Sequence, residues 1–204
     1  MGVVKRSAIV LGMMILAAPV AGGEPAPPVS PGSEYVPTTD PQHPKARYTD
    51  SLVSMNDRCP VRQSTLSLAY VPVYVNGQPV GFCCHSCPSV FVQDPDRYLR
   101  ALGITPPDLF HKGKPATVDS SLRYRIGFEI YYFSSRADMD QFKKDPLRYC
   151  GVLTDPVSMA RFRPTAASPR TTHNQRLYYF AADSTRDVFL KNPSLHQDRR
   201  TGLN

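Results

Sequence analysis

Four of the five cysteines lie close together in the sequence, and their spacing is typical of a thiol site. Cys59 stands alone, and 23 residues separate it from Cys83, which is followed by Cys84 and Cys87 with His85 between them. Thiolates bind soft metal ions such as Cu(I) and Zn(II), and they also exchange disulfides. These five residues therefore form the candidate site of the chain.

Three uses of the cysteines remain open from the residues alone. In a metal site for copper or zinc, Cys59, Cys83 and Cys87 are the expected ligands, and Cys84, His85 or water completes the coordination of zinc. In an oxidising compartment, the four cysteines of this cluster also fit structural disulfides. The third use is thiol–disulfide exchange by the Cys-x-x-Cys pair, Cys84 and Cys87.

No other motif points to chemistry. The chain lacks a nucleophile elbow, a phosphate-binding loop, an HExxH helix and a dinucleotide-binding fingerprint. We therefore predict no catalytic residues and no organic cofactor, and we do not expect an enzyme. Cys150 is interpreted as a buried apolar side chain. The formal net charge of +7 is modest, so we do not expect a nucleic-acid partner.

The first 54 residues are predicted to carry an export signal and a spacer. Residues 1–23 combine Lys5 and Arg6, an apolar run over 8–18 and small residues after it, which is the order of a secretory signal peptide. This order predicts export to a bacterial periplasm. Residues 24–54 are rich in proline and poor in large apolar side chains, so we interpret them as an extended tether.

Beyond the tether, a pattern of phenylalanine and proline occurs three times. Phe82, Phe133 and Phe180 are each followed by a second Phe after nine residues and by Pro after 13. The copies lie 51 and 47 residues apart, a spacing typical of repeated supersecondary units. We predict an α+β fold of three tandem units, each a β-hairpin plus a helix, over 55–103, 104–149 and 150–197, with a tail over 198–204.

Turn residues and prolines predict the elements of each unit. In the first unit, Asn76-Gly77 is a hairpin turn between strands over 70–75 and 79–82. Pro72 and Pro79 lack the backbone N–H, so both strands are expected at sheet edges. The other expected elements are strands over 122–126, 128–133 and 177–180, and helices from Pro88 and over 136–144 and 185–191.

The segments NDRCPV and GFCCHSCPSVFVQDPDRYL resemble the YHS domain and its relative, the TRASH domain. The family pattern is a lone Cys, a hairpin-length spacer, an aromatic residue with Cys, three further residues and Cys; Cys59, Phe82, Cys83 and Cys87 match it. The resemblance implies small treble-clef-like units and heavy-metal sensing, trafficking or resistance. It also implies a soft metal ion as partner, and an exported or membrane metal-transport protein as a possible second partner.

The second and third units resemble the family in their aromatic pattern but not in their cysteines. In the third unit, Ser158 stands where we align the first family Cys and Ala181 stands at the second. The second unit has Ser134 at this second place and no opening Cys. A metal function is therefore expected in the first unit alone, where Cys84 and His85 are additions to the family pattern. The other two units are expected to serve packing or partner binding.

Overall fold

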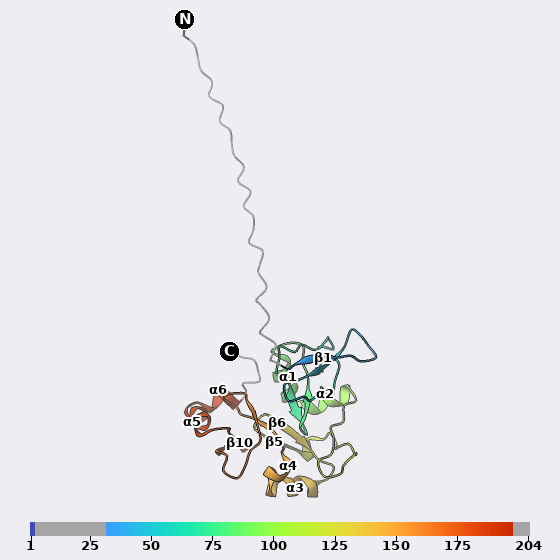
Figure 1. Cartoon of the computed structure of the whole chain (residues 1–204), viewed down its shortest axis with the longest axis vertical. Coiled ribbons are helices and arrows are strands. Elements are labelled where there is room, and N and C mark those ends of the chain that lie inside the picture. Colours follow the sequence, from blue (N-terminus) through green and yellow to red (C-terminus); the bar gives the residue numbers. More distant parts are fainter. Residues whose placement is uncertain (3–31, 198–204) are drawn as a thin grey trace.

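The computed structural model of the chain describes residues 1–2 and 32–197 (Figure 1). The predicted tail, the start of the predicted tether and the predicted signal peptide apart from its first two residues lie outside them. Within the described residues the fold is α+β, as predicted. No helix in this part of the chain is long and apolar enough to cross a membrane.

Three hairpins form one six-stranded sheet at the centre of the molecule. Their strands are β3 (Val73–Val75) and β4 (Gln78–Val80), β5 (Arg123–Ile126) and β6 (Glu129–Tyr132), and β9 (Arg170–His173) and β10 (Arg176–Tyr179). They lie in the order β4-β3-β6-β5-β10-β9. Each hairpin is antiparallel, whereas β3 with β6 and β5 with β10 pair in parallel. The three predicted segments therefore share one sheet.

The two prolines of the first hairpin have different effects. β4 contains Pro79 and lies at the edge of the sheet, as expected of a strand that lacks one N–H donor. The edge prediction for the other strand is wrong, because β3 pairs with both β4 and β6. Pro72 lies just before β3, where its missing N–H removes no hydrogen bond from the sheet.

Each hairpin is followed by two short helices that a proline separates. The pairs are α1 (Cys87–Gln93) and α2 (Pro95–Ala101), α3 (Arg136–Lys144) and α4 (Pro146–Tyr149), and α5 (Asp183–Lys191) and α6 (Pro193–Gln197). Asp94, Asp145 and Asn192 occupy the junctions with φ of −141°, −144° and −152°. A proline disfavours helical conformation in the residue before it, so the first helix ends there. The three pairs lie at separate places around the central strands (Figure 1).

Two phenylalanines form the centre of each small core. The rings of Phe82 and Phe91 lie 5.5 Å apart between centroids, and the corresponding distances are 5.1 Å for Phe133–Phe142 and 5.3 Å for Phe180–Phe189. All six side chains are at most 1% exposed. The nine-residue offset in the sequence therefore reflects one contact, between the end of a hairpin and the helix after it, that is made three times.

Part of the predicted tether is folded onto the first unit. β1 (Glu34–Val36) pairs with β2 (Lys45–Arg47), and the buried Ala46 and Tyr48 join the core around Phe82. The tether prediction is therefore corrected for residues 34–54. A segment with few apolar side chains can order itself when a neighbouring unit supplies the rest of the core.

Asn76 connects the first two hairpins, and its replacement should be costly. Its buried amide donates to the carbonyl oxygens of Pro107 and Tyr132, both at 2.8 Å, and accepts from the Tyr132 N–H at 2.7 Å. Asn76→Ala leaves these groups without partners, so we expect denaturant titration to show a loss of about 2–4 kcal/mol in unfolding free energy.

Asn174→Ala is the matched control for this prediction. Asn174 takes the same left-handed turn conformation, with φ of 48° against 47° for Asn76, but its side chain is exposed and contacts Gln197. The control should cost about 1 kcal/mol, because alanine takes the left-handed conformation less readily than asparagine. Similar losses in the two variants would show that turn conformation, and not the connection between hairpins, determines the effect.

Candidate metal centre

The first unit brings three cysteines together, which we call the thiol triad: Cys59, Cys83 and Cys87. Cys59 lies in the turn that opens the unit, Cys83 follows β4, and Cys87 is the first residue of α1. Their Sγ atoms all lie within 4.8 Å of one another, and those of Cys83 and Cys87 are 3.7 Å apart. Tetrahedral zinc with Zn–S bonds of about 2.3 Å holds its sulfurs about 3.8 Å apart. The triad can therefore hold a metal ion.

The triad lies at the margin of the first core. Cys59 and Cys87 are 0% and 1% exposed, whereas Cys83 is partly exposed. No disulfide joins any of the five cysteines in this structure. Within residues 1–2 and 32–197, no other group of three or more His, Cys, Asp or Glu residues is placed to hold an ion. The site therefore has two buried candidate ligands and one that solvent can reach.

The two additional candidates lie beside the triad in different ways. The Sγ of Cys84 lies 2.6 Å from that of Cys87 and 3.4 Å from the Ser86 hydroxyl. Cys84 is therefore in place to serve as a fourth ligand or as the partner of Cys87 in a disulfide. His85 is exposed, and no contact connects its side chain to the triad.

Burial and neighbouring thiols determine which cysteine ionises. Burial, followed by the thiols of Cys84 and Cys59, raises the pKa of Cys87 well above its usual range. Burial also raises the pKa of Cys83. Burial acts the same way on Cys84, but hydrogen bonds with Cys87 and Ser86 outweigh it and lower the pKa of Cys84 to about 7. A metal ion on the triad must displace protons, so its binding should release them.

The turn that carries Cys59 occurs in all three units, and we call it the opening turn. A backbone bridge closes it each time: Arg58–Thr65, Pro107–Pro115 and Thr154–Arg161. In the third unit this bridge belongs to β7 (Leu153–Thr154) and β8 (Arg161–Phe162). The next residue is Cys59, Asp108 or Asp155, and its N–H donates at 2.9 Å to a carbonyl across the turn in every unit. These three residues are therefore structurally equivalent.

In the third unit, an aspartate makes the connection that the thiols would make through an ion. Asp155 is 0% exposed, and its carboxylate accepts hydrogen bonds from the Ala181 N–H at 2.8 Å and the Thr185 hydroxyl at 2.7 Å. Counted from the repeated Phe, Ala181 corresponds to Cys83 and Thr185 corresponds to Cys87. The carboxylate therefore connects the same three positions.

The second unit also has an aspartate in its opening turn. Asp108 is 8% exposed and accepts a hydrogen bond from the hydroxyl of Ser134, the counterpart of Cys83. Burial alone would raise the pKa of this carboxyl, but the hydrogen bonds from Ser134 and from the N–H groups of Phe110 and His111 lower it. In the second unit the carboxylate therefore connects two of the three positions, and the third, Asp138, accepts a hydrogen bond from the Ser135 hydroxyl instead.

The alignment of Ser158 with the first family cysteine is corrected by this geometry. Asp155, three residues earlier, occupies the place of Cys59, while Ala181 does lie at the place of Cys83. The signal was present in the sequence, since Pro-Val follows both Cys59 and Asp155. Asp108 lacks this signal, because Leu-Phe follows it and its turn is one residue longer.

Cys150 lies apart from the triad. It is 2% exposed and packs in the core around Phe133 and Phe142. Burial, with a smaller contribution from Glu129, raises the pKa of Cys150 to about 11. This agrees with its interpretation as an apolar side chain.

Comparisons with protein families, with curated proteins and with solved structures give no match to this chain. Function is therefore inferred from the geometry of the site.

Proposed function

We propose that this protein is an exported heavy-metal-binding protein that holds copper or zinc on the thiol triad and acts in metal handling, trafficking or resistance. One observation carries the proposal: three equivalent positions are connected by a carboxylate in the third unit, two of them are so connected in the second, and all three are thiols in the first. Uncharged thiols are weak hydrogen-bond partners, so they replace a carboxylate poorly unless an ion joins them.

The choice of metal follows from the number of thiolates. Three thiolates suit Cu(I), whereas zinc requires a fourth ligand. Cys84 is the nearest candidate, at 2.6 Å from Cys87 between sulfurs. The partly exposed Cys83 supports transfer of the ion to an exported or membrane transport protein, which we propose as partner. The proposal includes the periplasm as location, YHS/TRASH-like units, and binding without catalysis.

Elemental analysis with thiol counting tests the proposal. We expect about one Zn(II) or Cu(I) per chain after reconstitution under reducing conditions. In the loaded protein, alkylation and peptide mapping should find the triad protected, and a chelator should expose it. Cys150 should be unreactive in both states because it is buried. The proposal would be contradicted if the triad were alkylated at the same rate with and without metal. It would also be contradicted if the protein bound neither Zn(II) nor Cu(I).

A second candidate function, thiol–disulfide exchange, is favoured by the contact between Cys84 and Cys87. In that reaction a bond forms between the two sulfurs, and the two electrons and protons pass to a partner disulfide. Cys87 belongs to both the pair and the triad, so the two functions exclude each other in one molecule. If oxidised glutathione produces a Cys84–Cys87 bond and reconstitution never yields bound metal, the second function is preferred.

A further inference from the structure

A second site lies on the sheet, at a cleft that three arginines line. Arg123 and Arg125 come from β5, Arg176 begins β10, and the opposite wall includes Ser89 and Gln93 of α1. Ser120 of a short 3-10 helix (Ser120–Leu122) closes one side. The cleft has a volume of about 590 Å³, as a small-molecule site does, and none of the described residues that line it is acidic.

The strand register places the three arginines together. Arg123 and Arg125 are two residues apart on β5 and therefore point to one face of the sheet. β10 pairs in parallel with β5 at Leu177 and Ile126, so Arg176 lies beside Arg125. Adjacent like charges on one face destabilise a sheet, and an anion between them removes this cost.

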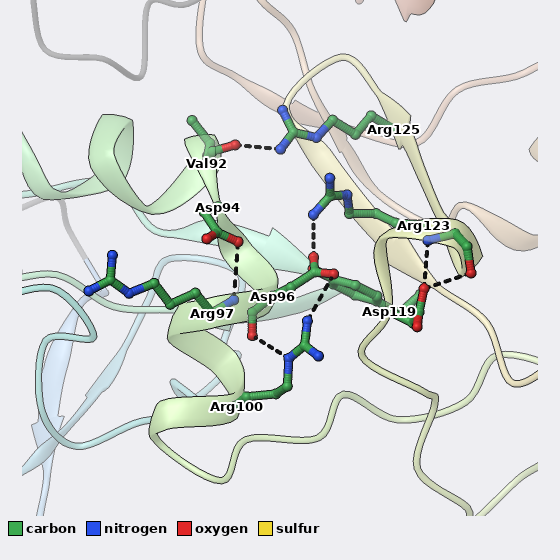
Figure 2. Close-up of polar contacts among 10 residues, drawn as sticks. Val92, Asp94, Asp96, Arg97, Arg100, Asp119, Arg123 and Arg125 are labelled. Carbon is green, nitrogen blue, oxygen red and sulfur yellow. Dashed lines mark hydrogen bonds and ion pairs between the residues drawn. The ribbon is translucent and has the colours of Figure 1, made fainter.

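Two of the guanidinium groups are held in place by neighbours. Arg123 forms an ion pair with Asp96, which is 4% exposed in its side chain, and Arg125 donates to the carbonyl oxygen of Val92. Figure 2 shows both guanidinium groups extending from β5 toward the helices. A guanidinium has five N–H donors, so Arg123 retains donors for a ligand beside its bond to Asp96.

Arg176 differs from the other two arginines. Its guanidinium has no hydrogen bond or ion pair to any of the described residues. Asp96, which binds Arg123, also pairs with Arg100, so this carboxylate is shared between two cations (Figure 2). The cleft therefore keeps an excess of positive charge.

We propose that this cleft binds a small dianion carrying phosphate or carboxylate groups. Arginine recognises both groups through paired, charge-assisted hydrogen bonds, and the fixed positions of Arg123 and Arg125 reduce the entropy lost on binding. Ser120 offers a hydroxyl group on another wall. This site contains no thiol and does not depend on the metal proposal.

Calorimetric titration of the full chain with inorganic phosphate and, separately, with succinate tests the proposal. We expect saturable binding of at least one of them at low ionic strength, weakened by added chloride. Arg176→Gln should weaken binding about tenfold or more. Arg176→Lys keeps the positive charge but loses the paired N–H donors of the guanidinium. Its affinity should therefore lie between those of Arg176→Gln and the unaltered chain.

Arg163→Gln is the matched control, because Arg163 is exposed and lies outside the cleft but carries the same charge. It should change the dissociation constant less than about twofold. If both glutamine variants lost the same affinity, the change in net charge alone would explain the effect, and the proposed site would be wrong. Absence of saturable binding of both anions would overturn it too. Binding should be the same with and without metal, so failure here leaves the metal proposal intact.

Discussion

Replacing Cys87 by Ser is expected to remove the bound metal and to lower the melting temperature together. Cys87 is 1% exposed and its Sγ contacts those of both Cys83 and Cys84, so its replacement removes the buried thiol that these two cysteines share. When the free ion is present at one hundred times its dissociation constant, its binding stabilises the folded protein by about 2.7 kcal/mol, and the variant loses this stabilisation. In a chain of this size the melting temperature should fall by about 5–10 °C. Elemental analysis and calorimetry on the same samples measure both effects.

Cys150→Ala is the control for this prediction. It also removes one buried thiol, but its site lies in the second core and not in the triad. It should keep about one metal ion per chain and lose little stability, because the cavity it leaves is small. If Cys150→Ala lost the metal equally, the metal site would lie near Cys150 and not at the triad. If Cys87→Ser kept one metal ion per chain, Cys87 would not be a ligand.

A triple replacement tests the equivalence of the three units more sharply. Cys59→Asp, Cys83→Ala and Cys87→Thr together give the first unit the residues found at the same positions in the third. The introduced carboxylate should accept hydrogen bonds from the backbone at position 83 and from the new hydroxyl. This variant should bind no metal, and its melting temperature should not respond to a chelator. A variant that binds no metal and is unfolded would contradict the equivalence of the units.

Asp155→Ala is expected to destabilise the third unit strongly. The carboxylate accepts four hydrogen bonds, from the N–H groups of Val157, Ser158 and Ala181 and from the Thr185 hydroxyl. Without it these donors lose their partners, and unfolding free energy should fall by about 3 kcal/mol or more. Asp187→Ala, at an exposed carboxylate of α5, is the control and should cost less than about 1 kcal/mol.

The effect of Asp155→Ala should depend on pH in one direction. Burial acts to raise the pKa of Asp155, but its hydrogen bonds outweigh burial and lower it below the ordinary value. A lowered folded pKa stabilises the protein above the unfolded pKa of about 3.9, and this stability is lost as the pH falls through the folded pKa. Urea titrations at pH 7 and below pH 4 should therefore show the difference from the unaltered chain shrinking in acid. A constant difference would assign the effect to packing.

Local patterns predict the elements well because each depends on neighbouring residues. The prolines after Asp94, Asp145 and Asn192 end the helices where expected, and the helix over 136–144 is confirmed at both ends. The thiol triad was also predictable, since a hairpin of fixed length returns Cys83 to Cys59.

Features that depend on distant residues were not predictable in this way. The parallel joins between hairpins leave no periodic signal, because each involves strands from different units. Burial of Tyr48 depends on Leu66 and Phe82, which lie in another segment. The role of Asp155 was missed because a single acid before Pro is a common turn pattern, and only its buried partners distinguish it.

The arrangement of strands also determines an order of folding. Hairpin partners lie a few residues apart, as Val73 and Val80 do, so their loops close early. The parallel joins link residues such as Val75 and Ile130, and these contacts must wait until the following unit exists. A chain that emerges from its amino end will therefore form the hairpin of β3 and β4 first, while β3 still presents an unpaired edge. Until β6 arrives, that edge is open to pairing with other chains, and this interval is when the protein is most exposed to aggregation.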